Sequence, residues 1–184
     1  MVEEWALVNR EKIADYYIFD VDKTVKKSPR TGKEHTFFVL DSPDWVNVIP
    51  VTADDNVVMI RQIRHGIDAP VLEIPGGMVD DEDGDPAAAA ARELLEETGY
   101  TADRFIRIGS VTPNPAFLNN RLFTYLALNA HQVQQPEFDG SEDIEVEEIP
   151  RDQIPTLIAG GKIHHALVVA AFYHLERFRE QQQP

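Results

Sequence analysis

The chain has 184 residues, of which 43% are hydrophobic, so it can fold as one domain with a sizeable core and is not disordered. Its 17 Lys and Arg residues against 32 Asp and Glu residues give a net charge of −15, which argues against nucleic acid or an anionic membrane as partner. The absence of cysteine excludes disulfides, thiolate metal sites and cysteine nucleophiles. The acidic start lacks a secretory signal, and no apolar run predicts a membrane span, so we expect a cytoplasmic protein.

The first part of the chain predicts two antiparallel strands. Residues Tyr16–Val25 and His35–Leu40 are rich in aromatic and β-branched side chains, and the turn residues Ser28–Gly32 lie between them. Two paired strands are only marginally stable in water by themselves. We therefore expect this region to pack against another surface.

Six further strands are predicted in the rest of the chain. They are bounded by turn residues, and we expect them at 44–52, 56–64, 71–74, 105–111, 121–128 and 144–149. Together with three helices in a mixed order, they indicate an α/β or α+β fold. The expected division is an N-terminal strand region at 1–43, a main domain at 44–180 and a disordered tail at 181–184.

The first predicted helix, Pro86–Thr98, has clear signals at both ends. Asp85 is a typical N-cap residue before a proline at the first helical position, and Gly99 is typical of the residue just past a helix. Two more helices are expected at 151–159 and 164–179. The second of them places apolar residues at helical spacing, at Leu167, Val168, Ala171, Phe172 and Leu175.

Three glutamates near the end of the first helix are the main candidates for chemistry. Glu93, Glu96 and Glu97 are spaced i, i+3 and i+4, so their carboxylates share one face of the helix. The helix dipole disfavours negative charge there, so a cation would stabilise the cluster, and oxygen ligands suit Mg²⁺ or Mn²⁺. The alternative from these residues alone is a solvated acidic face whose charge Arg92 partly offsets.

The residues around these glutamates resemble the signature of the Nudix hydrolase family, G-x5-E-x7-R-E-U-x-E-E-x-G-U, in which U is apolar. The run Arg92–Tyr100 (RELLEETGY) matches its second half in full, and the preceding strand ends in Pro75–Gly77 (PGG). Similarity to the ADP-ribose pyrophosphatase branch extends to Trp45–Pro50, to Arg61–Gly66 and to Pro115, fifteen residues past Tyr100.

The loop in the first half of the signature departs from the pattern. Arg92 lies fifteen residues after Gly77, one more than in the signature, so the family's first glutamate falls on Asp83 or on Gly84. In the family this glutamate braces the loop against the helix. We expect Asp83 or Glu82 to take its place.

The resemblance implies a Nudix fold, an α/β/α sandwich with a mixed central sheet, and hydrolysis of the diphosphate linkage of a nucleoside diphosphate sugar. ADP-ribose, which would give AMP and ribose 5-phosphate, is the leading substrate, and GDP-mannose is the second. The resemblance also implies that the Gly76 carbonyl, Glu93, Glu96 and Glu97 hold Mg²⁺, with Mn²⁺ as the alternative. Glu96 and Glu97 would thereby be catalytic, because the metal activates water and neutralises phosphate charge.

The general base is expected to be a further carboxylate, since the glutamates of the signature would be occupied by metal. The ADP-ribose branch uses a glutamate on the loop before a Glu-Asp-Ile strand, and Glu142 matches it. The alternative is that Glu142 and Asp143 only cap a loop on an acidic surface.

Four residues are candidates for substrate binding: Arg61, Arg64, Glu73 and Pro115. Arg64 ends a predicted strand near the expected site and could pair with a phosphate. The alternative is an ion pair between Arg64 and a surface carboxylate such as Glu73. The neighbouring histidines His164 and His165 show no ligand spacing, and we expect them to be structural.

The resemblance also bears on partners and on a second functional hypothesis. Many members of the branch are dimers whose N-terminal strands pack across the twofold axis, so we expect a homodimer formed through residues 16–40, a nucleotide-sugar substrate, and neither nucleic acid nor membrane. The second hypothesis is a non-catalytic, ligand-sensing Nudix module. Gly84 favours it, whereas the complete Arg92–Glu97 run disfavours it.

Overall fold

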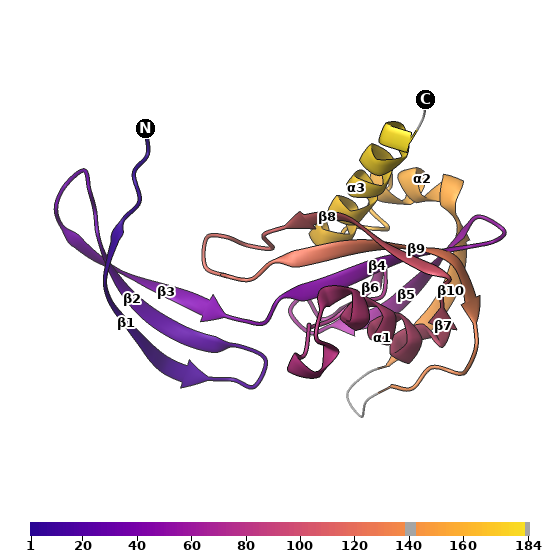
Figure 1. Cartoon of the computed structure of the whole chain (residues 1–184), viewed down its shortest axis with the longest axis horizontal. Coiled ribbons are helices and arrows are strands. Elements are labelled where there is room, and N and C mark those ends of the chain that lie inside the picture. The colour runs from indigo at the N-terminus through magenta and orange to yellow at the C-terminus, as the bar shows by residue number, and fades with distance from the viewer. Residues whose placement is uncertain (139–142, 183–184) are drawn as a thin grey trace. The chain divides into compact units, whose positions relative to one another are not determined.

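The computed structural model describes residues 1–138 and 143–182. Contacts divide the chain into two compact units, which are described separately (Figure 1). The first unit contains Met1–Asp44 and Thr112–Arg121, and the second contains Trp45–Val111 and the chain from Leu122 onward. The segment Thr112–Arg121, which lies within the range 44–180 expected for the main domain, thus belongs by its contacts to the first unit.

The first unit is an antiparallel sheet of three strands in the order β1-β2-β3, namely β1 (Ala6–Asp15), β2 (Asp20–Lys27) and β3 (Glu34–Asp41). The predicted hairpin between β2 and β3 is confirmed, and the Gly32 N–H closes its turn on the Ser28 carbonyl at 2.8 Å. Arg10 of β1 joins the strands, because its Nε donates to Asp22 of β2 at 2.5 Å and its Nη2 to Asp41 of β3 at 2.6 Å.

One prediction in this unit is wrong, and one strand was not predicted. Strand β1 was not predicted, and residues 16–19, predicted as the start of a strand, form the turn into β2, with Tyr17 at a φ of 57°. The residues of β1 are almost all exposed, so they do not show the alternation of buried and exposed side chains that identifies a strand. Pairing with β2 determines their conformation, and local sequence does not report that pairing.

The second unit is a seven-stranded mixed sheet of β4 (Trp45–Thr52), β5 (Asn56–Arg64), β6 (Ala69–Glu73), β7 (Tyr100–Thr101), β8 (Arg104–Val111), β9 (Leu122–Gln132) and β10 (Ile144–Pro150). The main path runs β10-β5-β4-β9-β7, with β6 beside β5 and β8 beside β9. Strands β4 and β9 pair in parallel and the other pairs are antiparallel. The predicted strands are confirmed to within a few residues at their ends, and only the short β7 was not predicted.

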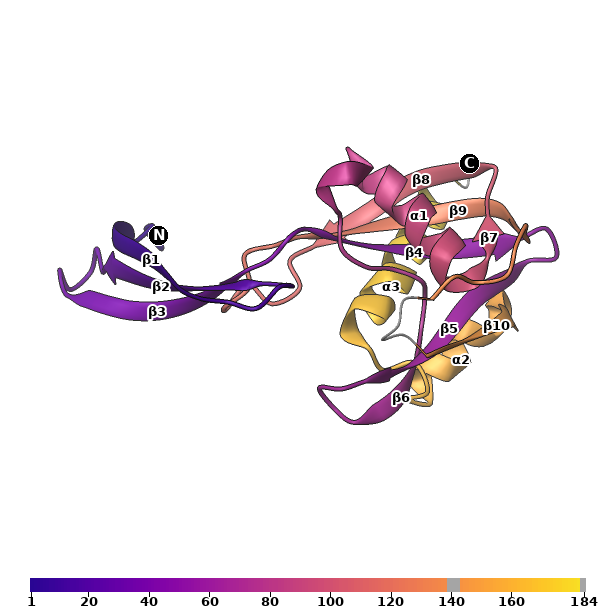
Figure 2. The ribbon, with the colours of Figure 1, turned by 90° about the horizontal axis from the view of Figure 1, so that it is seen from below.

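Helices cover both faces of this sheet, with α1 (Pro86–Thr98) on one side and α3 (Ala166–Gln182) on the other (Figure 2). Strand β4 supplies both cores through the alternation of its side chains. Val46 and Val48 pack with Leu94 of α1. Ile49 and Val51 lie in the core that contains α3 and α2 (Ile154–Ala159). The predicted α/β/α sandwich with a mixed sheet is therefore confirmed.

Helix α1 has the predicted bounds because both of its end signals operate. The Asp85 carboxylate accepts hydrogen bonds from the N–H groups of Ala87 and Ala88, at 2.8 and 2.9 Å. Gly99 ends the helix at a φ of 73°, and a Cβ there would lie 2.2 Å from the Gln134 carbonyl oxygen. Only glycine satisfies both conditions.

The two later helices differ slightly from prediction. The helix expected at 151–159 begins as a 3₁₀ turn, Arg151–Gln153, before α2. Helix α3 continues through Gln181 and Gln182, which were expected in the tail, because glutamine is a good helix former and does not end a helix. Across the described ranges, none of the helices is both long and apolar enough to span a membrane.

Candidate active site

The segment Pro75–Gly77 after β6 lies flat against β4. The Val46 N–H donates to the Gly77 carbonyl at 2.9 Å, and a Cβ at Gly76 would lie 2.3 Å from the Val46 carbonyl oxygen. Such close backbone approach requires glycine. Because successive carbonyls of an extended segment point to opposite sides, the Gly76 carbonyl points away from β4. The Gly76 N–H points the same way and donates to Glu97 Oε2 at 2.8 Å.

Two glutamates of α1 are buried against this glycine turn. Glu93 and Glu97 are only 9% and 4% exposed, and their i, i+4 spacing aims both toward the turn. A Cβ at Gly77 would lie 2.2 Å from Glu93 Oε1, so the Glu93 carboxylate fills the space that any other side chain at Gly77 would need. The structure thus brings together Gly76, Glu93 and Glu97, three of the four predicted metal ligands.

The fourth predicted ligand, Glu96, points toward solvent. Its side chain is 45% exposed, and its carboxylate accepts a hydrogen bond from Arg92 Nη1 at 3.0 Å. Among the described residues, no three histidine, aspartate or glutamate side chains converge closely enough to enclose an ion. The donor chemistry nevertheless fits a hard divalent cation, because Glu93, Glu97 and the Gly76 carbonyl offer only oxygen at a helix end whose dipole disfavours negative charge.

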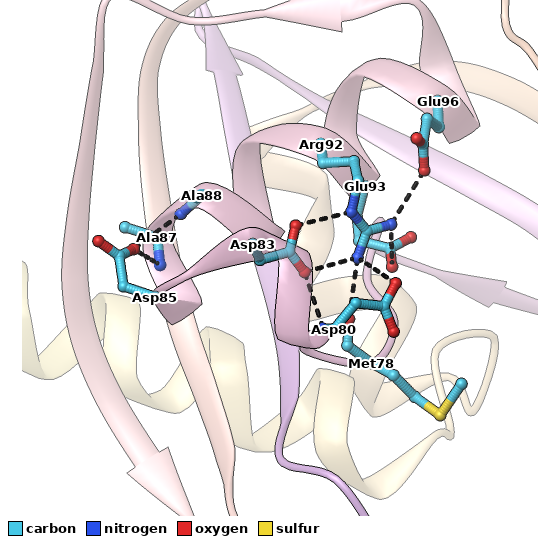
Figure 3. A network of polar contacts seen from close by, with 9 residues as sticks. All are labelled: Met78, Asp80, Asp83, Asp85, Ala87, Ala88, Arg92, Glu93 and Glu96. Atoms are coloured by element: carbon cyan, nitrogen blue, oxygen red, sulfur yellow. Dashed lines mark hydrogen bonds and ion pairs between the residues drawn. The ribbon is translucent and has the colours of Figure 1, made fainter. Parts of the chain in front are cut away.

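Arg92 links the acidic loop to α1 at the centre of a polar network (Figure 3). Its Nε and Nη2 donate to the two oxygens of Asp83 at 2.8 and 3.0 Å, and Nη2 also donates to the Met78 carbonyl at 3.0 Å. Its Nη1 donates to Glu93 and Glu96, each at 3.0 Å. The hydrogen bonds to Asp83 raise the pKa of Arg92 above its usual value, and in return Arg92 lowers the pKa of the Asp83 carboxyl. Both groups therefore stay charged, and the loop is fixed to the helix.

The extra loop residue is accommodated by local backbone geometry. Asp81–Asp83 form a 3₁₀ turn, and Gly84 follows at a φ of 77° before the Asp85 cap. This turn brings the Asp83 side chain to Arg92, whereas Glu82 is exposed. Asp83 is therefore the residue that braces the loop. Gly84 adopts the positive φ that follows the 3₁₀ turn, and Asp83 still braces the loop. Gly84 is therefore no longer an argument for the non-catalytic module.

Arg64, at the end of β5, forms a bidentate ion pair with Glu73 of β6. Its Nε and Nη2 each donate to one carboxylate oxygen at 2.7 Å. The ion pair between Arg64 and Glu73, which was the alternative to phosphate binding in the sequence analysis, is thus present. The Glu73 carboxylate is buried and not on the surface, since Glu73 is only 2% exposed. His165, directly before α3, places its Nδ1 3.4 Å from Glu73 Oε2. Burial lowers the pKa of His165 below its usual value, and this outweighs the opposing effect of Glu73.

The remaining predicted site residues are dispersed. Arg61 of β5 pairs with Glu147 of β10 at 2.6 Å, and both residues are half-buried. Pro115 lies in the segment Thr112–Arg121 of the first unit. Glu142, the predicted general base, lies outside the described residues.

A model of the family described as the NUDIX domain matches residues 41–172 of the chain. The chain belongs to the Nudix family. The resemblance to this family was based on the segments Pro75–Gly77 and Arg92–Tyr100, which contain the glycine turn, the buried glutamates and Arg92. The prediction of a Nudix hydrolase similar to the ADP-ribose pyrophosphatase branch is confirmed.

The curated relatives that match most of the chain include two pyrophosphatases. An ADP-ribose pyrophosphatase of Bacillus subtilis (strain 168) is 28% identical over 166 residues, which cover 90% of this chain and 86% of that protein. An ADP-sugar pyrophosphatase of Mus musculus is 31% identical over 161 residues, which cover 82% of this chain and 70% of that protein. A crystal structure of an ADP compounds hydrolase superposes with a TM-score of 0.86 at 20% identity, covers 99% of this chain and 97% of that chain, and supports the fold.

Proposed function

We propose that this Nudix hydrolase splits the diphosphate linkage of a nucleoside diphosphate sugar. ADP-ribose, giving AMP and ribose 5-phosphate, is the leading substrate, and GDP-mannose is the second. The relatives named ADP-ribose and ADP-sugar pyrophosphatase support this choice. The observation that carries the proposal is the burial of Glu93 and Glu97 against the Gly76–Gly77 turn, because buried carboxylates can bind a diphosphate only through a cation.

The proposed cofactor is Mg²⁺, with Mn²⁺ as the alternative, held by Glu93, Glu96, Glu97 and the Gly76 carbonyl. When bound, the metal would activate the attacking water and neutralise charge on the diphosphate oxygens. The protein prepares this site in advance, since the Gly76 N–H orients Glu97 and the space beside Gly77 accommodates Glu93. Glu96 is the ligand nearest to solvent.

Glu142 is proposed as the general base. The signature glutamates are committed to the metal, so the proton of the attacking water needs another acceptor. Glu142 precedes β10 in the sequence, at the position that matches the base of the ADP-ribose branch. This role is supported by the sequence alone, because the residue lies outside the described part of the chain.

Arg64 is proposed to bind a phosphate oxygen of the substrate. Its fork with Glu73 engages Nε and Nη2 and fixes the plane of the guanidinium, so Glu73 contributes to substrate binding through Arg64. Arg61 and Pro115 are proposed as further contacts from the resemblance alone.

A substrate panel tests the proposed substrate class. ADP-ribose, ADP-glucose, GDP-mannose and ATP are incubated with the enzyme and Mg²⁺, and the products are separated by anion-exchange chromatography. We expect kcat/KM for ADP-ribose to exceed that for GDP-mannose by about tenfold or more, with ATP cleaved far more slowly. Cleavage of ATP without cleavage of any nucleotide sugar would refute the proposal.

We further propose a cytoplasmic homodimer assembled through the first unit. Large hydrophobic side chains are exposed on two of its three strands, at Leu7, Val8 and Ile13 of β1 and at Phe37 and Phe38 of β3. A small sheet with exposed apolar side chains is unfavourable in water, and a second copy of the same sheet would cover them. Light scattering at micromolar concentration should give twice the monomer mass, and a clean monomer mass would rule the dimer out.

A further inference from the structure

We propose that His165 is a positioning residue, which holds Glu73 and through it fixes Arg64 in the orientation that binds the substrate phosphate. The proposal rests on the proposed function, since Arg64 acts on the diphosphate only if the protein is the hydrolase described above. It assigns a role to a histidine whose sequence context indicates only a structural residue.

The three side chains form a continuous chain of contacts from His165, directly before α3, to Arg64 at the end of β5. His165 Nδ1 lies 3.4 Å from Glu73 Oε2, and the same oxygen accepts the Arg64 Nη2 hydrogen bond at 2.7 Å. The Glu73 side chain is 3% exposed, so water does not compete freely for its oxygens. His165 Nδ1 is itself buried and has no well-formed hydrogen bond to any of the described residues. The Glu73 carboxylate is thus the acceptor that this nitrogen faces.

The protonation state of His165 suits this role. Burial lowers its pKa, the charges of Arg64 and His164 lower it further, and only Glu73 opposes them. The imidazole is therefore neutral at neutral pH and carries one proton. A lone pair on Nδ1 would repel the Glu73 carboxylate, so we place the proton on Nδ1, 3.4 Å from Oε2, where the positive end of the N–H dipole lies near the negative charge without forming an aligned hydrogen bond.

The contact matters because the Glu73 carboxylate, through its two hydrogen bonds with Arg64, helps to determine where the Arg64 guanidinium lies. The Arg64 side chain is 44% exposed and has many rotamers, so its bidentate ion pair with Glu73 contributes strongly to its orientation. Without the imidazole, the Glu73 carboxylate gains space beside Oε2 and can rotate. Arg64 would rotate with it and would meet the phosphate in the correct geometry less often.

Kinetics of three variants test the proposal: His165→Ala, His165→Asn and His164→Ala. His165→Ala should raise KM for ADP-ribose about tenfold while kcat stays within about twofold, because the lost contact orients a binding group. His165→Asn should restore most of the KM, since its amide N–H can reach the position of Nδ1. His164→Ala is the matched control, because His164 is the exposed neighbour, and it should behave like the wild type.

An NMR measurement gives a readout that needs no turnover. The Arg64 Nε–H signal is identified by its loss in Arg64→Lys, and its exchange with water is measured in each histidine variant. Exchange should be about tenfold faster in His165→Ala than in the wild type, and unchanged in His164→Ala.

The outcomes separate the two proposals. Unchanged KM and exchange in His165→Ala, or equal changes in both alanine variants, would overturn the role of His165. If the wild type hydrolyses no nucleotide sugar, the proposed function fails, and the exchange measurement alone decides whether His165 holds the Glu73–Arg64 pair.

Discussion

Replacing Glu97 with glutamine is expected to lower the turnover of ADP-ribose about a thousandfold while leaving the fold intact. Glutamine has the same size and keeps an oxygen that can accept the Gly76 N–H, which donates to Glu97 Oε2 at 2.8 Å. It removes only the negative charge, which is what a divalent cation requires. Turnover is measured over a range of Mg²⁺ concentrations, and the fold is checked by the melting temperature.

The matched control for this variant is Glu82→Gln. Glu82 is an exposed glutamate of the acidic loop, so its substitution changes the net charge equally without touching the buried cluster. We expect its turnover to stay within about twofold of the wild type. Equal activity of Glu97→Gln and Glu82→Gln would contradict a metal-binding role for Glu97.

Replacing Arg92 with lysine should lower both stability and activity. Arg92 donates in a fork to Asp83 and also reaches the Met78 carbonyl, Glu93 and Glu96. A lysine carries its donors on one nitrogen and cannot span these acceptors. We expect the free energy of unfolding to fall by about 2 kcal/mol and kcat/KM to fall about a hundredfold, because the loop and Glu93 lose their common partner.

Further variants test whether the loss in Arg92→Lys comes from this network or from replacing any arginine with lysine. Asp83→Asn breaks the Arg92–Asp83 hydrogen bonds from the loop side, so the double variant should lose little more stability than Arg92→Lys alone. Arg104→Lys changes an exposed arginine of β8 and should leave unfolding and activity unchanged. Chemical denaturation gives the free energy of unfolding of the four variants and the wild type. Fully additive losses for Arg92→Lys and Asp83→Asn would show that the two residues do not act as one network.

Local sequence was sufficient where local signals determine the structure. Helix α1 was predicted with its observed bounds because Asp85, Pro86 and Gly99 act within one turn of its ends. The glycine turn and the glutamate face followed from spacing along the chain, and the structure places Gly76, Glu93 and Glu97 together. These features need no information about distant residues.

Features that depend on distant residues could not be predicted in this way. Strand β1 lacks an apolar pattern and is a strand because it pairs with β2. The sequence left both Asp83 and Glu82 as candidates for bracing the loop, and the 3₁₀ turn before Gly84 places Asp83 against Arg92 of α1. The contact of His165 with Glu73 joins residues far apart in the sequence, so no motif could have identified it.

The most direct test of the central claim is the identity of the products from ADP-ribose with Mg²⁺ and with a chelator. The enzyme is incubated with ADP-ribose under both conditions, and the products are identified by mass spectrometry. The account predicts AMP and ribose 5-phosphate in equal amounts with Mg²⁺, and intact ADP-ribose with the chelator. Release of the same products at an undiminished rate in the chelator, or intact ADP-ribose with both Mg²⁺ and Mn²⁺, would contradict it.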